Sequence, residues 1–173
     1  MSVVLYVVLI LVTGGERIAE LVLSNRNAQW SFSRGGVESN RLQMPWMTAL
    51  HTGFLLGCIA EVLLADRPFI PWLGWPMLAI ALGCQAARYW CISVLGKQWN
   101  TRVIVVPGLE RITRGPYRFL RSPNYLVVAI EGIALPLVHT AWVTAITFTV
   151  LNAILLLVFR LPAEERALKA LAP

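Results

Sequence analysis

The sequence predicts an all-α integral membrane protein that forms one domain over residues 1–173. Hydrophobic residues make up 57% of the chain, and its mean hydropathy is +0.65. Charged residues make up only 14%, against about 25% in an ordinary soluble domain. Apolar runs of about 20 residues recur, which is the length that an α-helix needs to cross a bilayer. Together these observations predict about five transmembrane helices.

The first predicted span covers about residues 2–23 and carries charges in its second half. Glu16 and Glu20 share one helix face through their spacing of four, and Arg17 lies beside that face. Charges at this depth are expected to face other helices or water rather than lipid. An internal ion pair that fixes helix packing is the simpler interpretation of them. The polar stretch from Asn25 to Arg41 is predicted to be a loop.

Four further spans follow, separated by short turns and one long polar segment. The second span, over about 42–65, ends at a turn with the sequence DRPFIP, and the third covers about 72–95. The fourth, over about 123–138, is short because Pro136 ends it. A tight turn, HTAW, then leads to the fifth span at about 142–159.

Two polar segments, residues 96–125 and 160–173, flank this last pair of spans. The first contains TRVIVV, whose β-branched residues favour an extended conformation. The second is predicted to form a short polar helix, in which Pro162 suits the first turn. A short hairpin brings its two ends together, so residues 121–125 are expected to lie near residues 160–165.

Basic residues are concentrated in three regions, and five spans place these regions on the same side of the membrane. They contain Arg26, Arg34, Arg41, Lys97, Arg102, Arg111, Arg114, Arg118, Arg121, Arg160, Arg166 and Lys169. The two opposite turns contain only Arg67. Because lysine and arginine favour cytoplasmic loops, the N-terminus is expected outside and the C-terminus in the cytoplasm. Anionic headgroups also explain the net charge of +6, so no nucleic-acid partner is expected.

Three polar side chains inside the predicted spans are candidates for function. Glu131 lies about two turns inside a short span and needs a partner, such as a loop amide or a cofactor amine. His51 and Asn152 are candidate substrate contacts, but hydrogen bonding between helices explains each of them at least as well. The cysteines form no CxxC motif or Cys/His cluster, so they are expected to be small buried residues and no metal is predicted.

The order of the polar motifs resembles the isoprenylcysteine carboxyl methyltransferase family. The chain contains LGKQWNTRVIV, then GPYRFLRSPNY, then Glu131 and finally EERAL. The family signature is a Gly-Pro-Tyr, then an Arg-His-Pro-x-Tyr, then paired glutamates near the C-terminus. Two N-terminal stretches, ERIAELVLSNRNAQWSFSRGGVES and MPWMTALH, resemble a bacterial branch found beside type III polyketide synthases. Members of that branch methylate alkylpyrone or alkylresorcinol products.

The resemblance implies a methyltransferase of the bacterial inner membrane that uses S-adenosylmethionine and a lipophilic acceptor. Its cofactor site would lie at the cytoplasmic face, between the GPYRFLRSPNY segment and the C-terminal helix. The implied cofactor-binding residues are Gly115, Pro116, Tyr117, Arg121, Ser122, Pro123, Asn124, Tyr125, Glu164 and Glu165. The expected catalytic residues are Arg160, which would orient the methyl-accepting oxygen, with Glu131 and Glu164. The expected substrate contacts are His51, Asn152 and Trp99.

One position departs from the family pattern. Ser122 stands where the family has histidine, so a small hydroxyl replaces a ring nitrogen and a stacking plane. Weaker cofactor binding or a compensating residue is therefore expected. Two other functions stay open on the sequence alone: a sterol-type membrane reductase that uses NADPH, and a non-enzymatic subunit packed against a larger partner.

Overall fold

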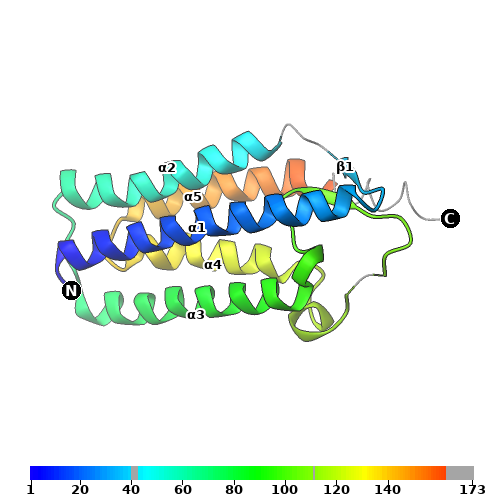
Figure 1. Cartoon of the computed structure of the whole chain (residues 1–173). Coiled ribbons are helices and arrows are strands. Elements are labelled where there is room, and N and C mark those ends of the chain that lie inside the picture. Colours follow the sequence, from blue (N-terminus) through cyan, green and yellow to red (C-terminus); the bar gives the residue numbers. More distant parts are fainter. Residues whose placement is uncertain (40–42, 111, 163–173) are drawn as a thin grey trace.

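The computed structural model describes residues 1–39, 43–110 and 112–162, and five long α-helices run up and down through this part of the chain (Figure 1). They are α1 (Val3–Phe32), α2 (Gln43–Leu64), α3 (Pro71–Leu95), α4 (Pro123–Leu137) and α5 (Trp142–Ile154). Short turns join α2 to α3 and α4 to α5 at the end of the bundle that holds the N-terminus. The long segment between α3 and α4 lies at the opposite end, which we call the loop end.

α4 is the central helix of the bundle. It runs between α3 and α5, and nearly all of its second half is buried (Figure 1). The apolar core gathers around it and consists of Tyr6, Ile10, Phe54, Cys58, Val62, Ala81, Val128, Ala134, Leu135, Val138, Ala141 and Phe148. The shortest predicted span is therefore the best enclosed one, which suits the polar residues that it carries.

The other helices present apolar side chains to their surroundings, as a membrane protein requires. Within the described residues, three segments are long and apolar enough to cross a membrane, namely Met44–Leu64, Pro71–Gln98 and Trp142–Arg160. Exposed leucines, isoleucines and valines cover their outer faces. The predicted all-α integral membrane fold is confirmed, and α2, α3 and α4 begin and end close to the predicted spans.

α1 extends beyond its predicted end, so the prediction of a loop from Asn25 onward is wrong. The helix continues to Phe32 because its polar residues bind the segment that follows α3 rather than water. Asn27 Nδ2 donates to the carbonyl oxygens of Trp99 at 2.7 Å and Gly96 at 3.2 Å. The helix ends where the backbone N–H of Gly36 donates to the carbonyl oxygen of Ser31 at 2.9 Å.

Two short strands close the loop end. β1 (Val37–Ser39) pairs antiparallel with β2 (Val103–Val105), and Glu38 lies opposite Ile104. The extended conformation predicted for TRVIVV is confirmed, whereas β1 falls in a stretch predicted to be a loop. The pairing ties the long segment before α4 to the end of α1.

Candidate functional site

The GPYRFLRSPNY segment begins with a 3₁₀ turn, η2 (Gly115–Arg118), that packs against the end of α3. Gly115 has a φ of +58°, a conformation that favours glycine. A Cβ atom added there would lie 2.9 Å from Cγ2 of Val94. Pro116 is buried behind it. The Gly-Pro of the motif therefore allows a close approach of the backbone to α3.

Tyr117 projects from this turn into a half-buried position beside Cys91 of α3. Burial raises the pKa of the Tyr117 phenol well above its usual range, and the neighbouring thiol acts in the same direction. The hydroxyl therefore keeps its proton at physiological pH and can donate a hydrogen bond.

Ser122 and Pro123 start α4. Ser122 occupies the N-cap position, but its hydroxyl makes no capping hydrogen bond, whereas its carbonyl oxygen accepts from the N–H of Tyr125 at 3.1 Å. Pro123 is buried in the first turn, where its missing N–H costs nothing. Asn124 Oδ1 accepts a long hydrogen bond of 3.5 Å from Nη1 of Arg88. Arg121 is exposed, so this part of the motif has one residue in the core, Pro123, and one that is accessible to solvent.

Tyr125 contacts Arg160 at the loop end of the bundle. Arg160 Nε donates to the Tyr125 hydroxyl at 2.9 Å, and its guanidinium carbon lies 5.9 Å from the centre of the ring. Arg160 ends η3 (Leu155–Arg160), a π-helical turn that continues α5. The predicted approach of residues 121–125 to residues 160–165 is confirmed for this pair. Glu164 and Glu165 lie outside the described residues.

A cluster of two arginines and two glutamates, of which Arg88 and Glu131 are buried, joins three helices. Arg17 of α1 lies 2.6 Å from Glu20 and 3.1 Å from Glu131 of α4. Arg88 of α3 pairs with Glu131 and lies 3.7 Å from Glu20. The cluster is electrically balanced, which is what makes charges tolerable in an apolar bundle. The partners of Glu131 are thus arginines, rather than a loop amide.

His51 lies beside this cluster. Its Nδ1 is 2.8 Å from the carbonyl oxygen of Met47, which can only accept, so Nδ1 carries the proton and Nε2 is left as an acceptor. His51, Arg17 and Glu131 share the lining of a cavity of about 10 Å³, room for roughly one water molecule. Phe148 packs edge-on against the His51 ring.

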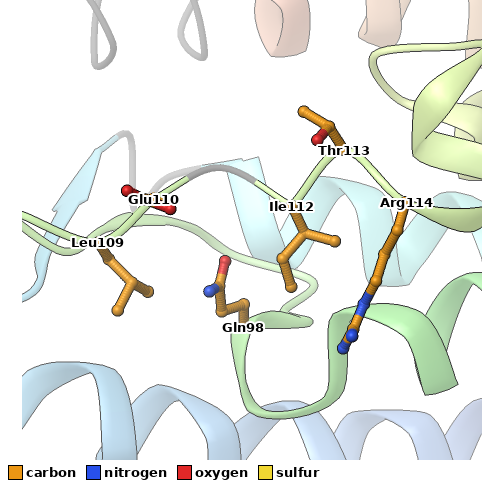
Figure 2. Close-up of a pocket in the computed structure, with 6 residues that line it drawn as sticks. All are labelled: Gln98, Leu109, Glu110, Ile112, Thr113 and Arg114. Atoms are coloured by element: carbon orange, nitrogen blue, oxygen red, sulfur yellow. The ribbon is translucent and has the colours of Figure 1, made fainter.

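A larger hollow of about 420 Å³ lies on the segment just before the motif (Figure 2). It is lined by Gln98, Leu109, Glu110, Ile112, Thr113 and Arg114. Figure 2 shows three side chains on the side of their segment that faces Gln98, namely those of Leu109, Ile112 and Arg114. A volume of this size falls in the range of small-molecule sites, and the lining offers a carboxylate and a guanidinium. None of its lining residues was a sequence candidate.

Two sequence candidates, Trp99 and Asn152, remain. Trp99 is buried where α1 meets the segment after α3, with its carbonyl oxygen bound to Asn27. Asn152 is buried on α5. Sequence reasoning missed the contact between Gly132 and Phe148: a Cβ added to Gly132 would lie 2.3 Å from the Phe148 ring. Within the described residues, no three His, Cys, Asp or Glu side chains are grouped to hold a metal ion.

The fold and the site define a helical membrane protein with a polar motif at one end and a balanced ion cluster inside. Comparison with known proteins gives the family. The model of the isoprenylcysteine carboxyl methyltransferase (ICMT) family matches residues 77–170, and the chain belongs to this family. Membership indicates a membrane methyltransferase. Both Tyr125 and Arg160 fall within the matched region.

A relative matches most of the chain. The protein is 40% identical over 155 residues to the uncharacterized protein YpbQ of Bacillus subtilis (strain 168). The match covers 89% of this chain and 90% of that protein. No solved structure matches the chain.

Proposed function

We propose that the protein transfers a methyl group from S-adenosylmethionine to an oxygen of a lipophilic acceptor that enters from the bilayer. The observation that carries this proposal is the Tyr125–Arg160 contact, which joins the family motif to the last helix at the loop end. Methyltransferases of this family generally use S-adenosylmethionine. S-adenosylmethionine, when bound, supplies an electrophilic methyl group carried on a sulfonium.

The residues of the loop end fit this cofactor. The hollow of about 420 Å³ is lined in part by Arg114, the residue before the motif glycine. Glu110 offers a carboxylate to the positively charged groups of the cofactor, and Arg114 offers a guanidinium to its carboxylate. The protonated Tyr117 hydroxyl and the backbone of residues 115–125 supply further polar contacts. Glu164 and Glu165, which lie outside the described residues, are proposed as further cofactor-binding groups on the family resemblance alone.

The acceptor oxygen would bind at Arg160. Its guanidinium stabilises an enolate, phenolate or carboxylate oxygen, and Tyr125 fixes its position. The apolar side chains of α5 and α4 keep bulk water away from the reacting oxygen. His51 Nε2 and Glu131 are proposed to act on the acceptor from deeper in the bundle, and Trp99 is proposed to contact it at the loop end. Glu131 acts as a positioning group, because Arg17 and Arg88 hold it.

We favour O-methylation of an alkylpyrone or alkylresorcinol over carboxyl methylation of a prenylcysteine. The support is the N-terminal resemblance to the bacterial branch, which also suggests a functional link to a type III polyketide synthase. The test is a transfer assay with methyl-labelled S-adenosylmethionine in which both acceptor classes are offered side by side. Label in the alkylresorcinol or alkylpyrone supports the preference, and label in the prenylcysteine alone reverses it.

We also propose that the loop end faces the cytoplasm in the bacterial inner membrane. The described basic residues of the loop end, among them Lys97, Arg102, Arg114 and Arg118, support this orientation, since only Arg67 lies in the opposite turns. A fluorescent protein fused to the C-terminus should fold and fluoresce. A periplasmic reporter that is active at the C-terminus would reverse the orientation.

A further inference from the structure

A π-helical turn decides which residues of the last helix face the interior. Seven residues make about two turns of an α-helix, so Phe159 would share the face of Asn152 if α5 stayed α-helical. A π-helical turn holds an extra residue, which rotates the following side chains by one position. Accordingly, Arg160 is only 7% exposed, whereas Phe159 is 48% exposed. The turn therefore places Arg160 on the inner face that carries Asn152.

Asn152 is a buried amide with an unpartnered acceptor. Its side chain is 3% exposed, and within the described part of the chain Oδ1 has no hydrogen-bond partner. Buried polar atoms are nearly always paired, so an orphan acceptor points to a group that is absent from the structure. Phe148, one turn away on the same face, packs against Gly132 of α4 and His51 of α2. Asn152 thus lies between Phe148 and Arg160 along the inner face of α5.

We propose that Asn152 is a specificity residue that accepts a hydrogen bond from a second hydroxyl of the acceptor headgroup. This inference rests on the proposed function, because it takes Arg160 as the group that binds the methyl-accepting oxygen. Arg160 lies about two turns after Asn152, and its Cα–Cβ bond points back toward Asn152 because these bonds tilt toward the N-terminus of a helix. A resorcinol ring would present one oxygen to Arg160 and its other hydroxyl to Asn152. A hydroxypyrone has only the hydroxyl that is methylated, so within the proposed acceptor class the inference favours the alkylresorcinol.

The unpartnered atom also selects against another acceptor class. A carbonyl oxygen accepts hydrogen bonds and cannot donate them. Oδ1 of Asn152 can therefore accept a hydrogen bond from a phenol or enol hydroxyl, which carries a proton. A carboxylate has acceptor oxygens only, and would leave Oδ1 of Asn152 buried and unpaired beside a negative charge. Among oxygen groups, the unpartnered Oδ1 accordingly favours a second, protonated hydroxyl.

The test compares two acceptors that differ by one hydroxyl: an alkylresorcinol and the meta-alkylphenol with the same tail. Wild-type protein should show a kcat/KM for the resorcinol at least about tenfold above that for the phenol. Asn152→Leu should bring the ratio near one, by lowering the value for the resorcinol. Thr149→Val is the matched control, because Thr149 Oγ1 already donates to Ala145 of its own helix at 2.7 Å. Its ratio should equal that of the wild type.

Asn152→Ala is measured in parallel, so that a folding defect specific to leucine does not decide the result. An unchanged ratio in a folded Asn152 variant overturns the inference while leaving the proposed function intact. Absence of transfer to both acceptors by folded wild-type protein instead counts against the proposed function. In that case the inference about Asn152 is tested by the rise in thermal midpoint that each acceptor causes. The inference requires that the resorcinol stabilise the wild type more than the phenol does, and that Asn152→Leu remove the difference.

Discussion

The Nε atom of Arg160 donates a hydrogen bond of 2.9 Å to the hydroxyl of Tyr125, a residue 35 positions earlier in the chain. Tyr125 lies in the first turn of α4, and Arg160 ends the π-helical turn that follows α5. Each residue therefore holds the other in position at the loop end of the bundle. The pair connects the motif that resembles a cofactor-binding segment to the arginine that would bind the acceptor.

Tyr125→Phe should reduce methyl transfer while leaving the fold intact. The substitution removes the hydroxyl that positions Arg160 and keeps the aromatic ring. Loss of a hydrogen bond to a charged group costs about 1.5–3 kcal/mol, so kcat/KM should fall by roughly 10- to 100-fold. The measurement is label transfer from S-adenosylmethionine at matched expression.

Tyr89→Phe is the matched control for this change. Tyr89 also donates its hydroxyl to a charged group, Glu16 at 3.2 Å, but it is exposed on α3. Its substitution should leave kcat/KM within about twofold of the wild type, since exposed pairs contribute little. Equal losses in the two variants would show that Tyr125 has no special role.

Glu131→Gln should destabilise the protein strongly. The carboxylate pairs with Arg17 and Arg88, and its loss leaves the buried Arg88 and the partly buried Arg17 with Glu20 as their shared carboxylate. Breaking a buried ion pair on one side costs about 3–5 kcal/mol. The thermal midpoint in detergent should fall clearly.

A double substitution separates charge balance from chemistry. Arg88→Met with Glu131→Leu removes one cation and one anion and leaves the Arg17–Glu20 pair. The double variant should be more stable than Glu131→Gln, because no unpaired charge stays buried. If the double variant loses as much stability as Arg88→Met and Glu131→Leu lose together when each is made alone, the cluster does not act as a unit.

Gly132→Ala should destabilise the bundle, since a Cβ there would lie 2.3 Å from the Phe148 ring. Overpacking of this kind costs about 1–3 kcal/mol. Gly83→Ala is the control, because a Cβ at Gly83 meets nothing within 4 Å and alanine favours a helix. Phe148→Leu should recover part of the stability lost in Gly132→Ala. A drop in the thermal midpoint that is the same for both alanine variants would contradict this packing.

Apolar runs predicted the helices because their lengths match a bilayer, and the short hairpin of the last two spans predicted the approach of Tyr125 to Arg160. The end of α1 could not be predicted in the same way. Its asparagines and serines resemble a loop in the sequence, yet Asn27 binds a backbone segment some 70 residues later. β1 was missed for a related reason, since its partner strand is supplied by the same distant segment.

The deeper parts of the site depended on tertiary contacts that no spacing reveals. Arg88 and Glu131 stand 43 positions apart, on different helices. The π-helical turn was also invisible, since a regular helix would have turned Phe159 rather than Arg160 inward. The Gly132–Phe148 contact has no sequence pattern beyond a glycine in a helix.

The most direct test of the central claim is label transfer by wild-type protein and by Arg160→Lys in bilayer discs. Lysine keeps the positive charge but lacks the Nε donor that Tyr125 holds. Folded wild-type protein should transfer label from S-adenosylmethionine to a lipophilic acceptor, and Arg160→Lys should be slower by about 100-fold. Equal transfer by both proteins, or stabilisation of the wild type by NADPH and not by S-adenosylmethionine, would contradict the account.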